Sequence, residues 1–186
     1  MAFFLGFRPD TESVNKIDRV SRQVKEVFHG FDVDVRWSKP NTYHLSVVYL
    51  GEKISFIQLL YYKYRLKNFA YRKFDVRLGR VKVGISRRYK ELVYLEVLEG
   101  GDEMRKLCSQ LRDCLGLKRD FNLIPHLTLG RINKDLSEQE NSNVSRNLSF
   151  ISKDLEKEKI QFTVNTVDLL QGVDGKYALK HRIELV

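Results

Sequence analysis

Two short apolar stretches of this chain each carry a histidine followed, two positions later, by a hydroxyl residue. The stretches cover residues 43–51 and 123–132, where β-branched and aromatic residues between turn residues predict strands. Alternate side chains of a strand share one face, so each stretch is expected to present an imidazole beside a hydroxyl group. The two pairs are His44 with Ser46 and His126 with Thr128. We expect the fold to bring these two faces together.

The other hydrophobic patterns predict strands and helices that alternate around the two motifs. Gly30 is expected to cap the first helix at its C-terminus, and Asp102 and Gly116 are expected to cap a cysteine-bearing helix at its two ends. The predicted helices cover residues 11–29, 54–69, 103–115 and 136–159. The further predicted strands cover residues 2–8, 33–37, 74–85, 92–98, 161–171 and 176–185, the last two as a hairpin.

The composition predicts one folded domain, residues 1–186, without a membrane span. Of the 186 residues 42% are hydrophobic, and no apolar run approaches the roughly 18 residues of a transmembrane helix. Residues 2–7 are too short for a signal peptide, so we expect a cytoplasmic protein. Cys108 and Cys114 lie on one apolar helical stripe and are expected to pack in the core. The histidines and cysteines lack zinc-site spacing, so no metal and no cofactor is predicted.

The net charge of +9 is concentrated in residues 53–90. That segment holds twelve lysines and arginines and a single acidic residue, so it carries +11 while the rest of the chain carries −2. Aromatic residues are interleaved with the cations, as suits a polyanion whose bases can stack. We interpret the segment as RNA-binding; the alternative is a solvated face whose aromatic residues belong to the core. Three cations on a predicted loop are expected to reach the body of an RNA, unless the loop faces away and only aids solubility: Arg87, Arg88 and Lys90.

The motifs and their surroundings resemble the 2H phosphoesterase superfamily, which is named for two His-x-Ser/Thr motifs. The closer match is its branch of RNA 2′,3′-cyclic phosphodiesterases, also called 2′-5′ RNA ligases. The resemblance covers nearly the whole chain, including the opening strand, Trp37, both motifs and the closing hairpin. Two positions depart from it: Ser46 stands where this branch usually has Thr, and residues 81–86 lack a Phe-Pro that often follows Gly there. The resemblance implies a bilobal α+β fold, with two mainly antiparallel sheets related by pseudo-two-fold symmetry around a central groove.

The resemblance also implies a chemistry that suits the residues. Opening a cyclic phosphodiester needs a base that takes a proton from water and an acid that protonates the leaving ribose oxygen. Two imidazoles can hold opposite protonation states, because their unperturbed pKa lies near 6.5. By resemblance His44 is the proton donor, His126 is the proton acceptor, and no metal is required. Ser46 and Thr128 would donate hydrogen bonds to the phosphate oxygens. Arg131, three residues after Thr128, is either a further phosphate-binding residue or an ordinary surface arginine.

Three functions are open on the sequence. The favoured one is a monomeric, metal-independent enzyme that hydrolyses 2′,3′-cyclic phosphate ends of RNA, such as tRNA fragments, to 2′-phosphates, with reversible 2′-5′ ligation as a second activity of the same site. The second is another enzyme of the same superfamily, an exonuclease of RNA 3′ ends or a phosphodiesterase of 2′-5′ oligonucleotides, because the same two histidines would serve. The third is a basic RNA-binding module in which both histidines are structural.

Overall fold

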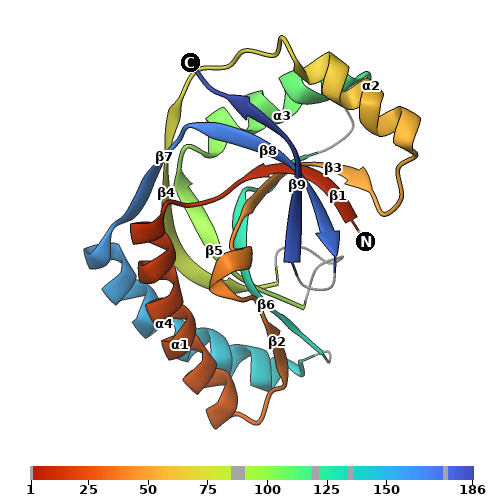
Figure 1. The fold of residues 1–186 in the computed structure, drawn as a ribbon. Coiled ribbons are helices and arrows are strands. Elements are labelled where there is room, and N and C mark those ends of the chain that lie inside the picture. Colours follow the sequence, from red (N-terminus) through yellow and green to blue (C-terminus); the bar gives the residue numbers. More distant parts are fainter. Residues whose placement is uncertain (1, 85–90, 119–121, 134–135, 174–175) are drawn as a thin grey trace.

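The computed structural model describes residues 2–84, 91–118, 122–133, 136–173 and 176–186. The predicted RNA-contacting residues Arg87, Arg88 and Lys90 therefore lie outside the described residues. In the described part, strands form a strongly curled sheet and helices pack against it (Figure 1). None of the described helices has the length and apolar character needed to cross a membrane.

The observed elements follow the predicted patterns closely. The helices are α1 (Thr11–Gly30), α2 (Phe56–Leu66), α3 (Gly101–Leu115) and α4 (Glu138–Glu158), with a short 3₁₀ turn at Pro40–Thr42. The strands are β1 (Ala2–Phe7), β2 (Val35–Trp37), β3 (Leu45–Gly51), β4 (Phe74–Val83), β5 (Leu92–Glu99), β6 (His126–Ile132), β7 (Ile160–Val164), β8 (Thr166–Val173) and β9 (Lys176–Glu184).

The two motif strands, β3 and β6, lie next to each other in the middle of the sheet. The strand order is β7-β4-β5-β6-β3-β1-β8-β9, with β2 added to β6, and the pairings among the described residues are antiparallel. The expected α+β fold with mainly antiparallel strands is confirmed. The two sheets that were expected form one continuous sheet here, because β3 and β6 are joined at the residue pair Leu45–Leu127.

Three local predictions were wrong in detail. Gly100, not Asp102, is the N-cap of α3, and Asp102 lies inside the first turn of the helix. Gly30 is the last residue of α1, and Phe31 caps that helix. The strand predicted at 161–171 is two strands, because β7 pairs with β4 while β8 pairs with β1 and β9. The predicted hairpin of β8 and β9 is confirmed.

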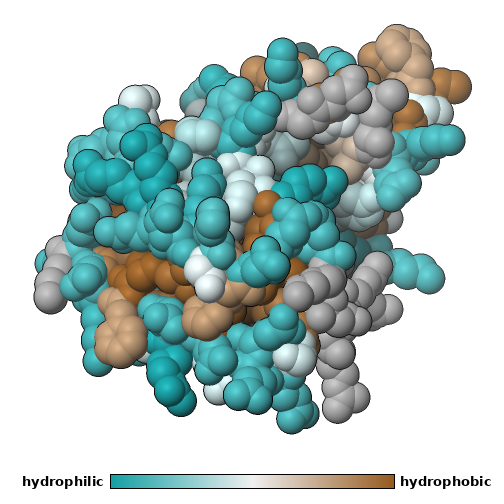
Figure 2. Space-filling view, turned by 90° about the horizontal axis from the view of Figure 1, so that it is seen from below, coloured by the Kyte–Doolittle hydropathy of each residue, from teal (hydrophilic) through white to brown (hydrophobic). Residues whose placement is uncertain are grey.

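The helices bury their apolar stripes against the sheet and against one another. Helices α1 and α4 contact each other, and they pack on β7 and β4 respectively, while α3 packs on β3 and β5 and supports α2. From below, a band of hydrophobic residues runs across the face where α1 and α4 lie (Figure 2). On α3, Cys108 is buried as expected, whereas Cys114 is partly exposed and its Sγ lies 3.2 Å from the backbone oxygen of Arg65.

Candidate active site

The two motifs meet where β3 and β6 pair. Leu45 and Leu127 lie opposite each other and are buried in the core. Their neighbours therefore point to the other face of the sheet, which we call the motif face. Continuing the antiparallel register places the histidine of each motif beside the hydroxyl residue of the other, with the two histidines as diagonal neighbours. Such neighbours have Cα atoms about 7–8 Å apart, close enough for both rings to reach one phosphate group. The four residues are His44, Ser46, His126 and Thr128.

Each imidazole is held in the same way by the backbone before it. Nδ1 of His44 lies 2.8 Å from the carbonyl oxygen of Thr42, and Nδ1 of His126 lies 2.8 Å from the carbonyl oxygen of Ile124. Because a carbonyl oxygen only accepts, Nδ1 must carry the hydrogen in both rings. Nε2 is then the atom through which each ring can exchange a proton with a ligand.

Two aromatic rings shield His44 from water. The rings of Phe4 in β1 and Tyr177 in β9 each lie 4.8 Å from the imidazole, centroid to centroid. This burial lowers the pKa of His44 from 6.5 to about 4, although the hydrogen bond to Thr42 acts in the opposite direction. The positive charges of His126 and Arg8 lower it further.

The second histidine has a similar environment. The ring of Tyr94 in β5 meets His126 edge to face at 5.7 Å. Burial lowers the pKa of His126, the hydrogen bond to Ile124 raises it, and the positive charge of Arg131 lowers it. Both rings are therefore neutral at pH 7 in the ligand-free protein. An anion between them would favour their charged forms and raise both pKa values.

A β-bulge in β6 brings Arg131 to the motif face. Every second residue of β5 lies opposite a β6 residue of the motif face, in the order His126, Thr128 and Arg131. Two β6 residues rather than one separate Thr128 from Arg131, so β6 holds one extra residue there. A bulge of this kind turns the following side chain to the other face, so a residue three positions after Thr128 shares its face. Gly130 fits here because a Cβ would lie only 2.8 Å from Val35 and 2.9 Å from Trp37. The β6 residues on the motif face are His126, Thr128 and Arg131.

The predicted phosphate-binding Arg131 has two charged neighbours that sequence reasoning missed. Its Nη1 donates to Oε1 of Glu91 at 2.8 Å, so the carboxylate of Glu91 would compete with a bound phosphate for the guanidinium. Arg36 in β2 lies directly opposite Arg131 in the strand pairing and shares its face. Two like charges at such positions repel each other, and a bound anion would relieve that repulsion.

The first motif has a corresponding irregularity. Phe4 and Gly6 in β1 lie opposite Tyr49 and Ser46, and β3 holds one residue more than β1 between these pairs. The bulge places Tyr49 on the motif face, where it is 52% exposed. A Cβ on Gly6 would lie 2.5 Å from the backbone oxygen of Leu45, so glycine allows the close approach of the two strands at the motif. Neither Tyr49 nor the rings around the histidines could be found without the strand register.

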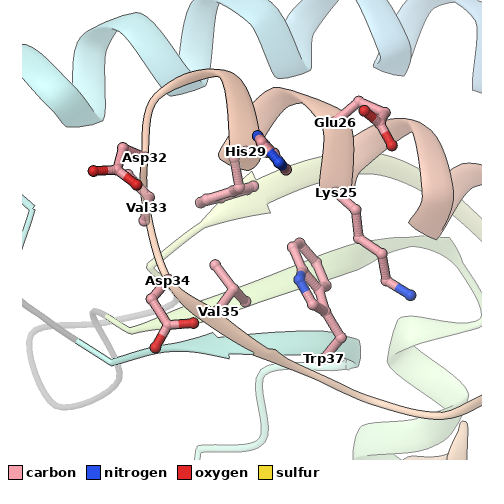
Figure 3. A pocket seen from close by; sticks show the side chains of 9 residues that line it. Lys25, Glu26, His29, Asp32, Val33, Asp34, Val35 and Trp37 are labelled. Carbon is pink, nitrogen blue, oxygen red and sulfur yellow. The ribbon is translucent and has the colours of Figure 1, made fainter.

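The structure also has a pocket that contains none of the predicted site residues. It has a volume of about 330 Å³ and lies between the end of α1 and β2 (Figure 3). Charged side chains and Trp37 line it, and Nζ of Lys25 lies 5.8 Å from the Trp37 ring. Within the described ranges, histidine, cysteine, aspartate and glutamate side chains do not gather in threes as metal ligands would.

Comparison with known proteins places these features in a family. A family model described as the 2′-5′ RNA ligase superfamily matches residues 63–176. The chain is similar to the crystal structure of E. coli LigT complexed with 3′-AMP, at 14% identity and a TM-score of 0.67, over 99% of this chain and 97% of that one. It is equally similar to the protein TT0787 of Thermus thermophilus, at 15% identity and a TM-score of 0.67, over the same shares of the two chains. Usb1 of Kluyveromyces marxianus matches at 13% identity and a TM-score of 0.56, over 96% of this chain and 95% of that one. No curated protein sequence matches the chain.

Proposed function

The chain belongs to the 2′-5′ RNA ligase superfamily, and we propose that it is a phosphodiesterase that opens 2′,3′-cyclic phosphate ends of RNA to 2′-phosphates. This membership confirms the resemblance expected from the two motifs. The observation that carries the proposal is the pairing of β3 with β6, which makes His44 and His126 diagonal neighbours on one face of the sheet. Each ring has its Nδ1 occupied by a carbonyl oxygen and so presents Nε2 for proton transfer.

The proposed reaction breaks the bond between phosphorus and the ribose O3′. Nε2 of His126 takes a proton from a water molecule as its oxygen attacks phosphorus, and Nε2–H of His44 gives a proton to the departing O3′. The products are a 2′-phosphate and a 3′-hydroxyl group. Ser46 and Thr128 donate hydrogen bonds to the non-bridging oxygens, and Arg131 balances their negative charge. With a 5′-hydroxyl as the nucleophile in place of water, the same proton transfers in the same direction form a 2′-5′ linkage, and cleavage of that linkage is the reverse reaction.

The low pKa of His44 sets a condition on this mechanism. With a pKa of about 4, the ring is neutral at neutral pH in the ligand-free protein and has no hydrogen on Nε2 to donate. The phosphodiester anion supplies the opposite charge that the protonated ring needs, so substrate binding and protonation of His44 are coupled. The acid thus becomes charged in the presence of the substrate.

Turnover of a 2′,3′-cyclic mononucleotide with EDTA present tests the proposal. His44→Ala and His126→Ala should each reduce kcat by roughly 10² or more, which is the size of a general acid or base contribution. Ser46→Ala and Thr128→Ala should reduce it less, because each removes one hydrogen bond to a charged group. Near-normal turnover in either histidine variant, or activity that is lost in EDTA and restored by a divalent ion, would contradict the mechanism.

Product analysis on an RNA with a 2′,3′-cyclic end separates the proposal from the other activities of the superfamily. Conversion to a 2′-phosphate without loss of a nucleotide supports cyclic phosphodiesterase activity. Stepwise shortening from the 3′ end would identify an exonuclease instead, and cleavage restricted to 2′-5′ linkages would identify the oligonucleotide phosphodiesterase.

A further inference from the structure

Helix α2 exposes large apolar side chains although it also has a buried face. Tyr62 and Leu66 point into the core, whereas side chains one turn apart on the opposite side face solvent. Three of these are more than 70% exposed: Phe56 at 72%, Ile57 at 78% and Tyr64 at 77%. Leu60 and Tyr61 extend the same face. A contiguous exposed apolar surface of this kind marks an interaction site.

The surroundings of this face are positively charged. Residues 53–74 contain six lysines and arginines and no acidic residue. Nη1 of Arg65 donates to the hydroxyl oxygen of Tyr61 at 3.0 Å, and the guanidinium lies 5.7 Å from that ring. Aromatic rings and guanidinium groups side by side are the arrangement on which nucleic acid bases stack while their phosphates are held.

The aromatic face of α2 lies close along the chain to the motif face. Helix α2 follows the motif strand β3, with only residues 52–55 between them. The seven residues of β3 span about 23 Å. A chain that leaves the motif face along β3 therefore reaches α2 after a few nucleotides.

We propose that α2 is a docking surface for single-stranded RNA, with bases stacked on Phe56 and Tyr64 and phosphates held by Lys63 and Arg65. The inference rests on the proposed function, because it extends the binding of RNA outward from the motif face. A second copy of the chain fits this face less well, since two surfaces of the same positive charge repel each other. The connection through β3 to the proposed phosphate site favours RNA over a membrane as the anionic partner.

Binding of a fluorescently labelled RNA of about twelve nucleotides, ending in a 3′-hydroxyl, tests this surface. Tyr64→Leu keeps an apolar side chain but removes the ring, and it should weaken binding about tenfold, as expected for one lost stack. Tyr64→Phe keeps the ring and should bind as the wild type does. Phe150→Leu is the matched control, because Phe150 on α4 is also an exposed aromatic residue of a helix, with Lys153 near its ring. Fluorescence anisotropy at fixed salt gives the affinities, and unchanged melting temperatures verify the folds.

Equal affinities for the wild type, Tyr64→Leu and Phe150→Leu would refute the docking surface. A dimer in sedimentation velocity that Tyr64→Leu dissociates would assign the face to a second copy. Binding to vesicles of phosphatidylserine and phosphatidylcholine, without binding to the RNA, would assign it to a membrane. The RNA in this assay has no cyclic phosphate and is not turned over. Failure of the docking surface is therefore measured separately from failure of the proposed hydrolysis.

Discussion

Sulfate bound at the motif face should raise the pKa of His44 from about 4 toward its ordinary value of 6.5. In the ligand-free protein the rings of Phe4 and Tyr177 partly shield the imidazole from water and disfavour its charged form. Sulfate is a suitable probe because it resembles a phosphate and keeps its charge throughout the titration. It supplies the negative charge that the buried imidazolium lacks.

The size of the effect follows from the two pKa values. At pH 6, an imidazole with a pKa of about 4 is roughly 1% protonated. An opposite charge within hydrogen-bonding distance raises a pKa by about 1–3 units, which would bring His44 to between one tenth and nine tenths protonated at that pH. The free energy of unfolding should also depend on pH, because His44 takes up its proton more readily in the unfolded chain and protonation therefore favours unfolding. The stabilisation that the neutral ring gives to the folded protein is fully present above pH 6.5 and is lost as the pH falls toward 4. Bound sulfate should reduce that loss.

Proton NMR of the imidazole C2 protons measures this directly, since the chain has only four histidines. His44→Gln assigns the resonance, and titrations with and without sulfate give the two pKa values. Tyr177→Ala should raise the ligand-free pKa by admitting water, whereas Tyr177→Phe should leave it low. A ligand-free pKa at or above 6.5, or a low one that bound sulfate does not move, would refute the reasoning. If the two histidines are the acid and the base, the pH profile of kcat/KM should have its maximum below 6.5.

Two further predictions concern the backbone and the charges around the site. Gly6→Ala should lower the free energy of unfolding by roughly 1–3 kcal/mol, because its Cβ would lie 2.5 Å from a backbone oxygen. Gly30→Ala, with no atom within 4 Å of the new Cβ, should raise that free energy by about 0.4–1 kcal/mol; urea unfolding measures both, and equal effects would contradict the geometry. Glu91→Gln should strengthen sulfate binding about two- to fivefold by releasing the arginine that Glu91 holds, while Arg36→Ala should weaken it by a similar factor. Isothermal titration calorimetry measures both affinities, and changes of the same sign would count against an anion site between the two arginines.

The sequence determined where the helices and most strands lie, and which two side chains of each motif share one face of a strand. Hydrophobic spacing has a period of 3.6 residues in helices and 2 in strands, so the helices and most strands could be located from local patterns. The same period of 2 places His44 with Ser46 and His126 with Thr128, because faces within a strand are a local property. The one strand that was misjudged, residues 161–171, changes partner after Val164, and a change of partner leaves the local hydrophobic pattern unbroken.

Only the tertiary structure decided how the groups of different strands combine. The pair Leu45–Leu127 makes the two histidines neighbours, and a β-bulge turns Arg131 toward them, in line with a phosphate-binding role that the sequence alone left open. The rings of Phe4 and Tyr177, which lower the pKa of His44, come from opposite ends of the chain. Strand register and bulges depend on packing between residues far apart in the sequence, so no short stretch of sequence encodes them. The proposed reactive groups are therefore visible in the sequence, whereas their protonation states and charged neighbours are properties of the folded sheet.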